Sequence, residues 1–153
     1  MISRLSAIRW RPDDENLGRK ISDMNKLRIL HVEDDPDILE ISRIALETIG
    51  GHEVHQFNNG AEAISRAVEI APDVFLLDVM MPGMSGEQTL AALRQLPECR
   101  PIPAIFMTAK AQESEVAKLR AVGAIDVIVK PFDPMTLAMQ INALLIAARR
   151  STA

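Results

Sequence analysis

The chain has 153 residues, of which 48% are hydrophobic and 25% are charged, and its formal net charge is -4. This length fits one domain, and the composition is typical of a globular protein with a hydrophobic core. The charge gives no basic footprint for nucleic acid, and the chain has no run of about 18 apolar residues that could span a membrane.

The first 25 residues differ in composition from the rest. Arg4 and Arg9 interrupt a short apolar stretch, so we expect no secretory signal, and no helical or strand period persists. We predict a flexible N-terminal extension over residues 1–25 and one folded domain over residues 26–150. Met24 stands just before the first strand-like run, so translation starting there is a second hypothesis for this segment.

From residue 27 onward, short apolar runs alternate with segments of helical period. Five runs are predicted to be strands: residues 27–32, 53–57, 74–78, 104–108 and 126–129. Several are apolar without alternation, as expected for parallel strands covered on both faces. This pattern predicts an α/β fold of the doubly wound, flavodoxin-like (βα)5 type, with helices on both faces and strand order 2-1-3-4-5.

Helix start signals agree with the five predicted helices. Asp35 and Asp133 are each followed by proline, which suits an N-cap before a proline in the first turn. Ser85 with Gln88 forms the pattern of a capping box. The last helix is predicted from about residue 135 to residue 148.

Carboxylates are concentrated at the ends of two strands. Glu33, Asp34 and Asp35 follow the first strand, and Asp78 ends the third. In this strand order the first and third strands flank the crevice where ligands bind. Two carboxylates at ~4 Å repel by about 4 kcal/mol at an effective dielectric of ~20, so a cation should share the site. Asp35 is the exception, because the N-cap role accounts for it.

Two further side chains are predicted at the same edge of the sheet. Thr108 ends the fourth strand and Lys130 follows the fifth. Each would be an ordinary strand or surface residue by itself. Together with the carboxylates and a divalent cation, however, they would suit an anionic, phosphoryl-like group.

The remaining candidates for chemistry are expected to be structural. Cys99 is the only cysteine, so an intrachain disulfide is excluded and a reducing, cytoplasmic setting is expected. A buried apolar role suits this residue. His31 should pack inside a strand, while His52 and His55 lie at a strand start that looks exposed. The three histidines form no metal-ligand pattern.

The sequences VEDDP (residues 32–36), LDVMMPGMSG (77–86), TA (108–109) and KPF (130–132) resemble the receiver domain of two-component response regulators. The resemblance covers residues 26 to about 148. It implies that Asp78 accepts a phosphoryl group from a phosphohistidine of a sensor histidine kinase or a histidine phosphotransfer protein. It also implies that Thr108 and Lys130 bind the phosphoryl oxygens.

The resemblance further implies a metal ion, Mg²⁺ or Mn²⁺. Asp34, Asp78 and the backbone carbonyl of Met80 would bind it directly, and Glu33 would help through water. A Mg²⁺-dependent phosphohydrolase is a weaker alternative, because hydrolases with an aspartyl nucleophile need a second Asp at the position of Met80. A phosphorylation-independent scaffold is the other alternative.

The same resemblance sets expectations for output. No output domain is expected, so signalling would depend on contacts with a downstream protein, without catalysis beyond slow self-dephosphorylation. A homodimer through the fourth helix, fifth strand and fifth helix is one further expectation. Receivers commonly carry Tyr or Phe three residues before the lysine, but here that residue is Val127. We therefore expect the switch to depend on Thr108 and on the fourth-helix to fifth-helix face.

Overall fold

The computed structural model describes residues 26–151, and the predicted extension over residues 1–25 lies outside them. The elements, in chain order, are β1 (Arg28–Val32), α3 (Pro36–Arg43), η1 (Ile44–Ile49), β2 (Glu53–Phe57), α4 (Gly60–Ile70), β3 (Val74–Asp78), α5 (Gly86–Leu93), β4 (Ala104–Thr108), α6 (Glu113–Ala121), β5 (Asp126–Val129) and α7 (Leu137–Ser151). Segment η1 is a π-helix that continues α3 without a break. None of the helices within residues 26–151 has the length and apolar character needed to cross a membrane.

The five strands form one parallel sheet in the order β2-β1-β3-β4-β5. The predicted fold class and strand order are therefore confirmed, and four of the five predicted strands have the observed bounds. The first strand begins one residue later than predicted, at Arg28. All strands end at the same edge of the sheet because every pairing is parallel.

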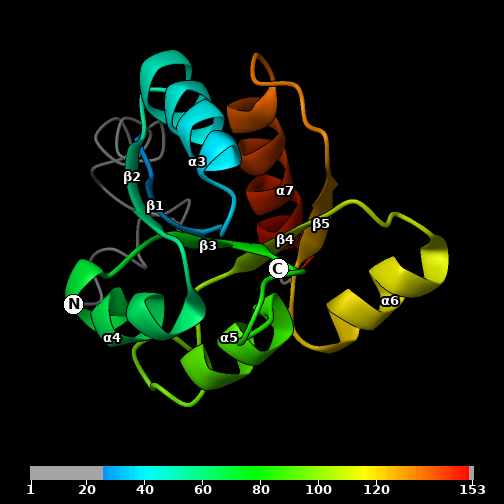
Figure 1. Ribbon diagram of the computed structural model, residues 1–153. Helices are drawn as coiled ribbons and strands as arrows, with labels where there is room; N and C mark the ends of the chain where they lie inside the picture. Colours follow the sequence, from blue (N-terminus) through cyan, green and yellow to red (C-terminus); the bar gives the residue numbers. More distant parts are fainter. Residues whose placement is uncertain (1–25, 152–153) are drawn as a thin grey trace, which may run out of the picture.

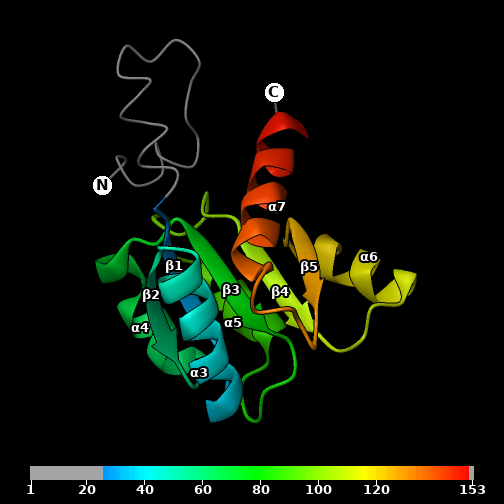
Figure 2. The same cartoon turned by 90° about the horizontal axis from the view of Figure 1, so that it is seen from above.

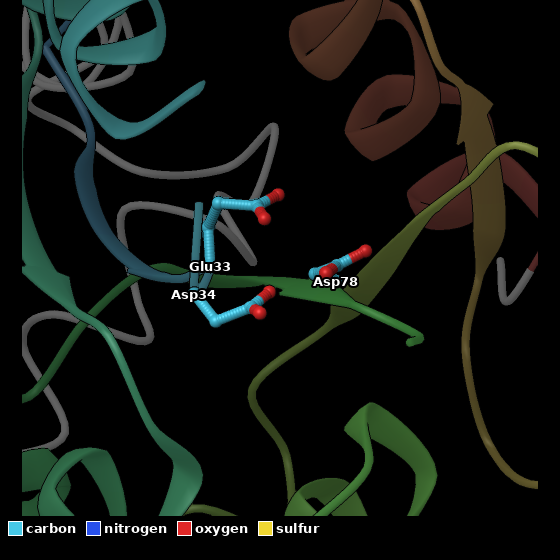
Figure 3. Close-up of side chains that lie close together, drawn as sticks. All are labelled: Glu33, Asp34 and Asp78. Carbon is cyan, nitrogen blue, oxygen red and sulfur yellow. The ribbon is translucent and has the colours of Figure 1, made fainter. Parts of the chain in front are cut away.

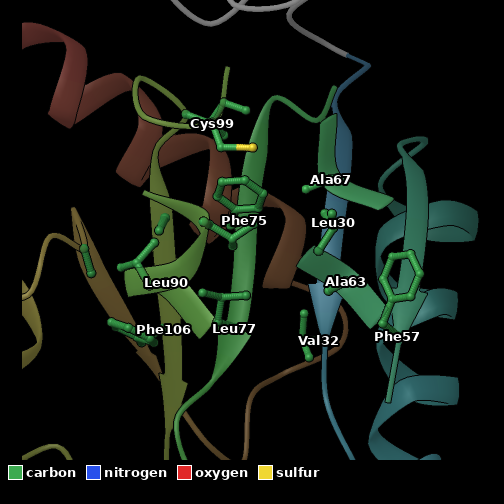
Figure 4. Close-up of a cluster of buried hydrophobic side chains, with 14 of the residues drawn as sticks. Leu30, Val32, Phe57, Ala63, Ala67, Phe75, Leu77, Leu90, Cys99 and Phe106 are labelled. Carbon is green, nitrogen blue, oxygen red and sulfur yellow. The ribbon is translucent and has the colours of Figure 1, made fainter. Parts of the chain in front are cut away.

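Helices cover both faces of the sheet, so the protein has three layers (Figures 1 and 2). The continuous helix α3–η1 and helix α7 lie on one face, where Leu46 and Ile141 pack against Ile29. Helices α4, α5 and α6 lie on the other face. There Ala67 and Leu90 pack in a second buried cluster with strand residues that include Phe75 (Figure 4).

Strands β3 and β4 are the most deeply buried of the five strands. Every residue of both strands is buried, as predicted from their unbroken apolar sequences. Because side chains of a strand alternate between faces, these two strands contribute to both cores. Their carboxyl ends are therefore fixed in position by packing on both sides.

Two of the predicted helix caps are confirmed. The Asp35 side chain accepts the Asp37 N–H at 2.9 Å at the start of α3. Ser85 and Gln88 form a reciprocal capping box at the start of α5.

The predicted start of the last helix is wrong by about two residues. The Asp133 side chain does accept the Met135 N–H at 2.9 Å, but the Thr136 N–H binds the Asp133 carbonyl in a tighter turn. Helix α7 begins only after that turn, at Leu137.

Two buried side chains illustrate what residue type alone can predict. Cys99 is completely buried, as predicted. The expectation that His52 is exposed is wrong, since only 5% of this residue is accessible and its Nδ1 accepts the Leu27 N–H at 3.0 Å. His52 immediately precedes the edge strand β2, but the end of η1 covers it.

Candidate functional site

Three carboxylates meet at the edge of the sheet where the strands end. Glu33 and Asp34 follow β1 directly, and Asp78 is the last residue of β3. Strands β1 and β3 are neighbours, with Val32 opposite Leu77. Each carboxylate offers an oxygen that lies within 4.8 Å of those of the other two (Figure 3). The predicted convergence of these residues is present in the structure.

Lys130 neutralises part of this acidic cluster. Its Nζ donates to Asp78 Oδ1 at 2.9 Å and to Glu33 Oε1 at 3.0 Å. The residue follows β5, and its backbone N–H donates to the Thr108 carbonyl at 2.8 Å. The Lys130-Pro131 peptide bond is cis.

Burial dominates the electrostatics of the cluster. Glu33 and Asp78 are 1% and 3% exposed. Burial raises the pKa of both carboxyls above their ordinary values, although the hydrogen bonds from Lys130 oppose this. Burial also disfavours the charged form of Lys130, but its bonds to the two carboxylates outweigh that cost and raise its pKa. The Lys130 pair therefore favours the charged forms of all three groups, while burial opposes them.

Thr108 lies beside the cluster at the end of β4. Strands β3 and β4 are paired so that Asp78 is opposite Met107, the residue before Thr108. Thr108 is 4% exposed, and its hydroxyl oxygen accepts the Lys110 N–H at 3.0 Å. The backbone of the following loop therefore holds this hydroxyl. Lys110 was not predicted, because a backbone donor leaves no signal in residue type.

The loop after Asp78 turns back sharply under the site. Met80 is 71% exposed, so its side chain lies outside the core, and the proposed use of its carbonyl as a metal ligand remains a prediction. The Gly86 N–H donates to the Val79 carbonyl at 3.0 Å. A Cβ atom at Gly86 would collide with the Asp78 carbonyl. Only glycine therefore permits this close return of the chain.

The donor set suits a hard divalent cation. Mg²⁺ prefers carboxylate oxygens and usually retains several waters. Asp34 is partly exposed, which leaves room for waters on one side of the three carboxylates. The residues present therefore fit Mg²⁺. The direct Lys130–Glu33 pair was not predicted, because sequence reasoning assigned Glu33 only a water-mediated role.

Comparison with known proteins places this site in a family context. Residues 29–142 match the family model for the response regulator receiver domain. Protein PilH of Pseudomonas aeruginosa is 38% identical over 118 residues, which cover 77% of this chain and 97% of PilH. The phosphate regulon transcriptional regulatory protein PhoB of Rhizobium meliloti is 39% identical over 122 residues, which cover 80% of this chain. The chain matches only 53% of that regulator's length.

Solved structures are similar over the same region. The chemotaxis protein CheY4 of Vibrio cholerae superposes with a TM-score of 0.72 at 30% sequence identity, over 76% of this chain and 97% of CheY4. A response regulator from Chloroflexus aurantiacus has a TM-score of 0.72 at 29% identity, over 79% of this chain and 98% of that chain.

Proposed function

The chain belongs to the response regulator receiver domain family, and from that membership we propose that Asp78 is its phosphoryl acceptor. The observation that carries the proposal is the Asp78 carboxylate, which is nearly buried at the end of β3, bound by Lys130 and close to Glu33 and Asp34. A lone buried carboxylate would be costly, and this arrangement suits a group that acquires more negative charge during a reaction.

The proposed step transfers a phosphoryl group from a phosphohistidine to Asp78. A carboxylate oxygen of Asp78 forms a bond to phosphorus while the bond from phosphorus to the histidine nitrogen breaks, and that nitrogen keeps the electron pair. Asp78 needs no general base, because it reacts as a carboxylate. Lys130 and the Thr108 hydroxyl would bind oxygens of the transferred group, so their main contribution would be charge neutralisation and orientation.

Asp34 and Asp78 would hold Mg²⁺ directly, with the carbonyl of Met80 as a further ligand, and Glu33 would help through water. When bound, the ion supplies charge neutralisation for the phosphoryl oxygens. This role is supported by the three clustered carboxylates, whose negative charge Lys130 alone does not balance.

The proposed output is a change in protein contacts, with no catalytic turnover. The chain would take its phosphoryl group from a sensor histidine kinase or a histidine phosphotransfer protein in the cytoplasm and then bind a downstream protein. Val127 is partly buried against the core and has no aromatic ring to reorient. We therefore assign the switch to Thr108 and to the face of α6, β5 and α7, which is also the proposed surface for any homodimer.

Two other functions fit the site less well. A phosphohydrolase would need an acid for the leaving group two residues after Asp78, where the exposed Met80 stands. A scaffold that is never phosphorylated could use Lys130 as a structural ion-pair partner of Glu33 and Asp78, but it gives no role to the third carboxylate of the cluster, Asp34.

Incubation with acetyl phosphate and Mg²⁺, followed by intact mass measurement, tests the proposal. We expect a mass gain of one phosphoryl group that is absent without Mg²⁺ and absent in Asp78→Asn. Asp73→Asn is a control, because Asp73 is a buried carboxylate at the opposite end of β3. If wild type gains no mass under any condition, the scaffold is the better assignment.

A further inference from the structure

We propose that residues 2–11 of this chain bind to its own folded domain, on the adjoining outer surfaces of the continuous helix α3–η1 and of helix α7. We define this α3/α7 surface by Ile41, Ile44, Met139 and Ile146. The occupant is a named part of the N-terminal segment that precedes the described residues. This inference goes beyond the proposed function and does not depend on phosphorylation of the chain.

The α3/α7 surface carries four large apolar side chains that solvent can reach. Ile41 and Ile44 are 43% and 48% exposed, and Met139 and Ile146 are 67% and 40% exposed. The first pair is three residues apart and the second pair seven, so each pair shares one side of its helix. Single exposed apolar side chains need no explanation, but two such pairs on neighbouring helices mark a site of interaction.

The two helices lie side by side on the same face of the sheet in both views (Figures 1 and 2). A Cβ atom at Gly50, at the end of η1, would meet Ala138 of α7. Met139 is the next residue around α7 from this contact, and it is exposed. One bound segment can therefore contact both helices.

The described chain begins beside these same helices. Leu27 is buried in one cluster with Leu46 of η1 and Leu145 of α7, and its N–H donates to His52 Nδ1 just after η1. Lys26, one residue earlier, is exposed. The N-terminal segment therefore leaves the domain next to the α3/α7 surface.

The segment is long enough to reach every part of this surface. Helices α3 and η1 have 8 and 6 residues, so together they are about 21 Å long at 1.5 Å per residue. Residues 12–25 link the proposed binding segment to the domain, and they could span about 45 Å when fully extended. Such a tether gives an effective concentration on the order of millimolar, which favours binding to the same chain over binding to a second copy.

The composition of residues 2–11 matches an apolar surface with acidic neighbours. These ten positions contain no carboxylate, and they combine large apolar side chains with arginines: Ile2, Leu5, Ile8 and Trp10 with Arg4, Arg9 and Arg11. On the domain, Asp37 and Glu40 are exposed on the same helix as Ile41. Arginine side chains pair with carboxylates while their stems cover apolar surface.

Charge also favours one direction of binding along the helices. Both helices follow strands that end at the acidic cluster, so Asp37 lies near that edge and the exposed Arg150 lies near the opposite edge, where the segment enters. Residues 13–15, Asp-Asp-Glu, are nearer to the domain in sequence than residues 2–11. They would meet Arg150 first, and the basic residues would then extend toward Asp37. The bound segment would cover this side of the approach to the acidic cluster.

Trp10 provides a direct test, because it is the only tryptophan and the chain has no tyrosine. Intrinsic fluorescence of the full chain therefore reports on the proposed binding segment alone. The measurements are the emission maximum and the quenching by acrylamide, compared with free N-acetyltryptophanamide. Thermal unfolding of each variant checks that its domain is folded.

Two variants each have a matched control. Ile41→Lys removes an apolar contact and places a cation opposite the arginines, while Val122→Lys makes the same kind of change at the end of α6, where the side chain is also 43% exposed. Arg4→Glu reverses a charge within residues 2–11, and Arg19→Glu reverses one outside them. Because Arg4 precedes the described domain, that variant keeps the test valid if Ile41→Lys does not fold.

We expect wild-type Trp10 to emit at shorter wavelength than the free compound and to be quenched at least about twofold less, as for a partly buried indole. Ile41→Lys and Arg4→Glu should shift the equilibrium toward the unbound segment by about tenfold, the effect of one interface contact, and so restore quenching toward that of the free compound. Val122→Lys and Arg19→Glu should behave like wild type. The same protection should persist on dilution, because the contact is within one chain.

Three results would overturn the proposal. The first is wild-type Trp10 that is quenched as readily as the free compound. The second is protection that Arg4→Glu leaves unchanged, or that Val122→Lys and Arg19→Glu abolish as well. The third is protection that disappears on dilution, which would mean that the segment binds a second copy.

Discussion

The ammonium group of Lys130 lies 2.9 Å from Asp78 Oδ1, although the two residues are 52 positions apart in the chain. The same ammonium binds Glu33, 97 positions away. These bonds join the ends of three different strands, β1, β3 and β5. Lys130 therefore links the site to the integrity of the whole sheet edge.

Replacing Lys130 by methionine should destabilise the metal-free protein at pH 7 by about 3 kcal/mol, the usual cost of breaking a buried ion pair. The pKa values of Glu33 and Asp78, already raised chiefly by burial, would rise further without the cation. The folded state of the variant then binds more protons than its unfolded state. Its loss of stability relative to wild type should therefore shrink as the pH falls toward 5.

Urea unfolding of Lys130→Met at both pH values, in EDTA, measures this effect. Lys118→Met is the control, because its side chain is 61% exposed and its partner Glu87 is 3.9 Å away. That variant should change the free energy of unfolding by less than about 1 kcal/mol. A deficit for Lys130→Met that is equally large at pH 5 would contradict the argument.

Removing one metal ligand should abolish stabilisation by Mg²⁺. A ligand at ten times its dissociation constant stabilises the folded state by about 1.4 kcal/mol. We expect thermal unfolding of wild type to shift upward with Mg²⁺ and to return with EDTA, while Asp34→Asn shows no shift. Asp37→Asn should respond like wild type, because Asp37 lies outside the cluster of three carboxylates. An equal shift in Asp34→Asn would remove Asp34 from the metal site.

Thr108 is expected to carry the switch, because Val127 has no ring to move. With beryllofluoride as phosphoryl mimic, wild-type backbone amide shifts should change at α6, β5 and α7 as well as beside Asp78. Thr108→Ala should bind the mimic but confine the changes to the site, and Thr108→Ser should behave like wild type because it keeps the hydroxyl. Two-dimensional NMR spectra provide the measurement. Distant changes that persist in Thr108→Ala would show that another residue transmits the signal.

The meeting of Glu33, Asp34 and Asp78 could be predicted from sequence because it depends on only two rules. Parallel strands end at one edge, and the strand order makes β1 and β3 neighbours. Both rules act on the backbone and require no knowledge of side-chain conformation. The same reasoning predicted Thr108 and Lys130 at that edge.

Contacts that depend on side-chain direction could not be predicted in this way. Nothing in the sequence indicates that Lys130 bonds Glu33 directly, or that Thr108 receives the Lys110 N–H. The burial of His52 was missed for a related reason, since its environment comes from η1 and the backbone of Leu27. Residue type determines which bonds are chemically available, and tertiary packing selects among them.

The buried imidazole of His52 should make stability depend on pH. Burial lowers its pKa below the ordinary value of 6.5. Below pH 6.5 His52 is protonated in the unfolded chain but stays neutral in the folded chain. The free energy of unfolding therefore decreases as the pH falls, by at most about 1.4 kcal/mol per pH unit. His52→Gln, which keeps an acceptor for the Leu27 N–H, should reduce the slope of unfolding free energy between pH 7 and 5.5. An unchanged slope would mean that His52 does not contribute.

Gly86 should be required for the geometry of the Asp78 loop, since a Cβ atom there would collide with the Asp78 carbonyl. We expect Gly86→Ala to lose about 2 kcal/mol or more of stability, the range for overpacking a buried site. We also expect it to be labelled more slowly by acetyl phosphate, because Asp78 is displaced.

Gly83→Ala is the matched control in the same loop. Gly83 has φ of +77°, and a Cβ atom there would meet no other atom within 4 Å. Alanine at this position should therefore cost only about 1 kcal/mol of stability through backbone strain. The labelling rate of Gly83→Ala should stay near that of wild type. Urea unfolding and intact mass measurement separate the two effects, and equal labelling of both variants would show that the close return at Gly86 does not position Asp78.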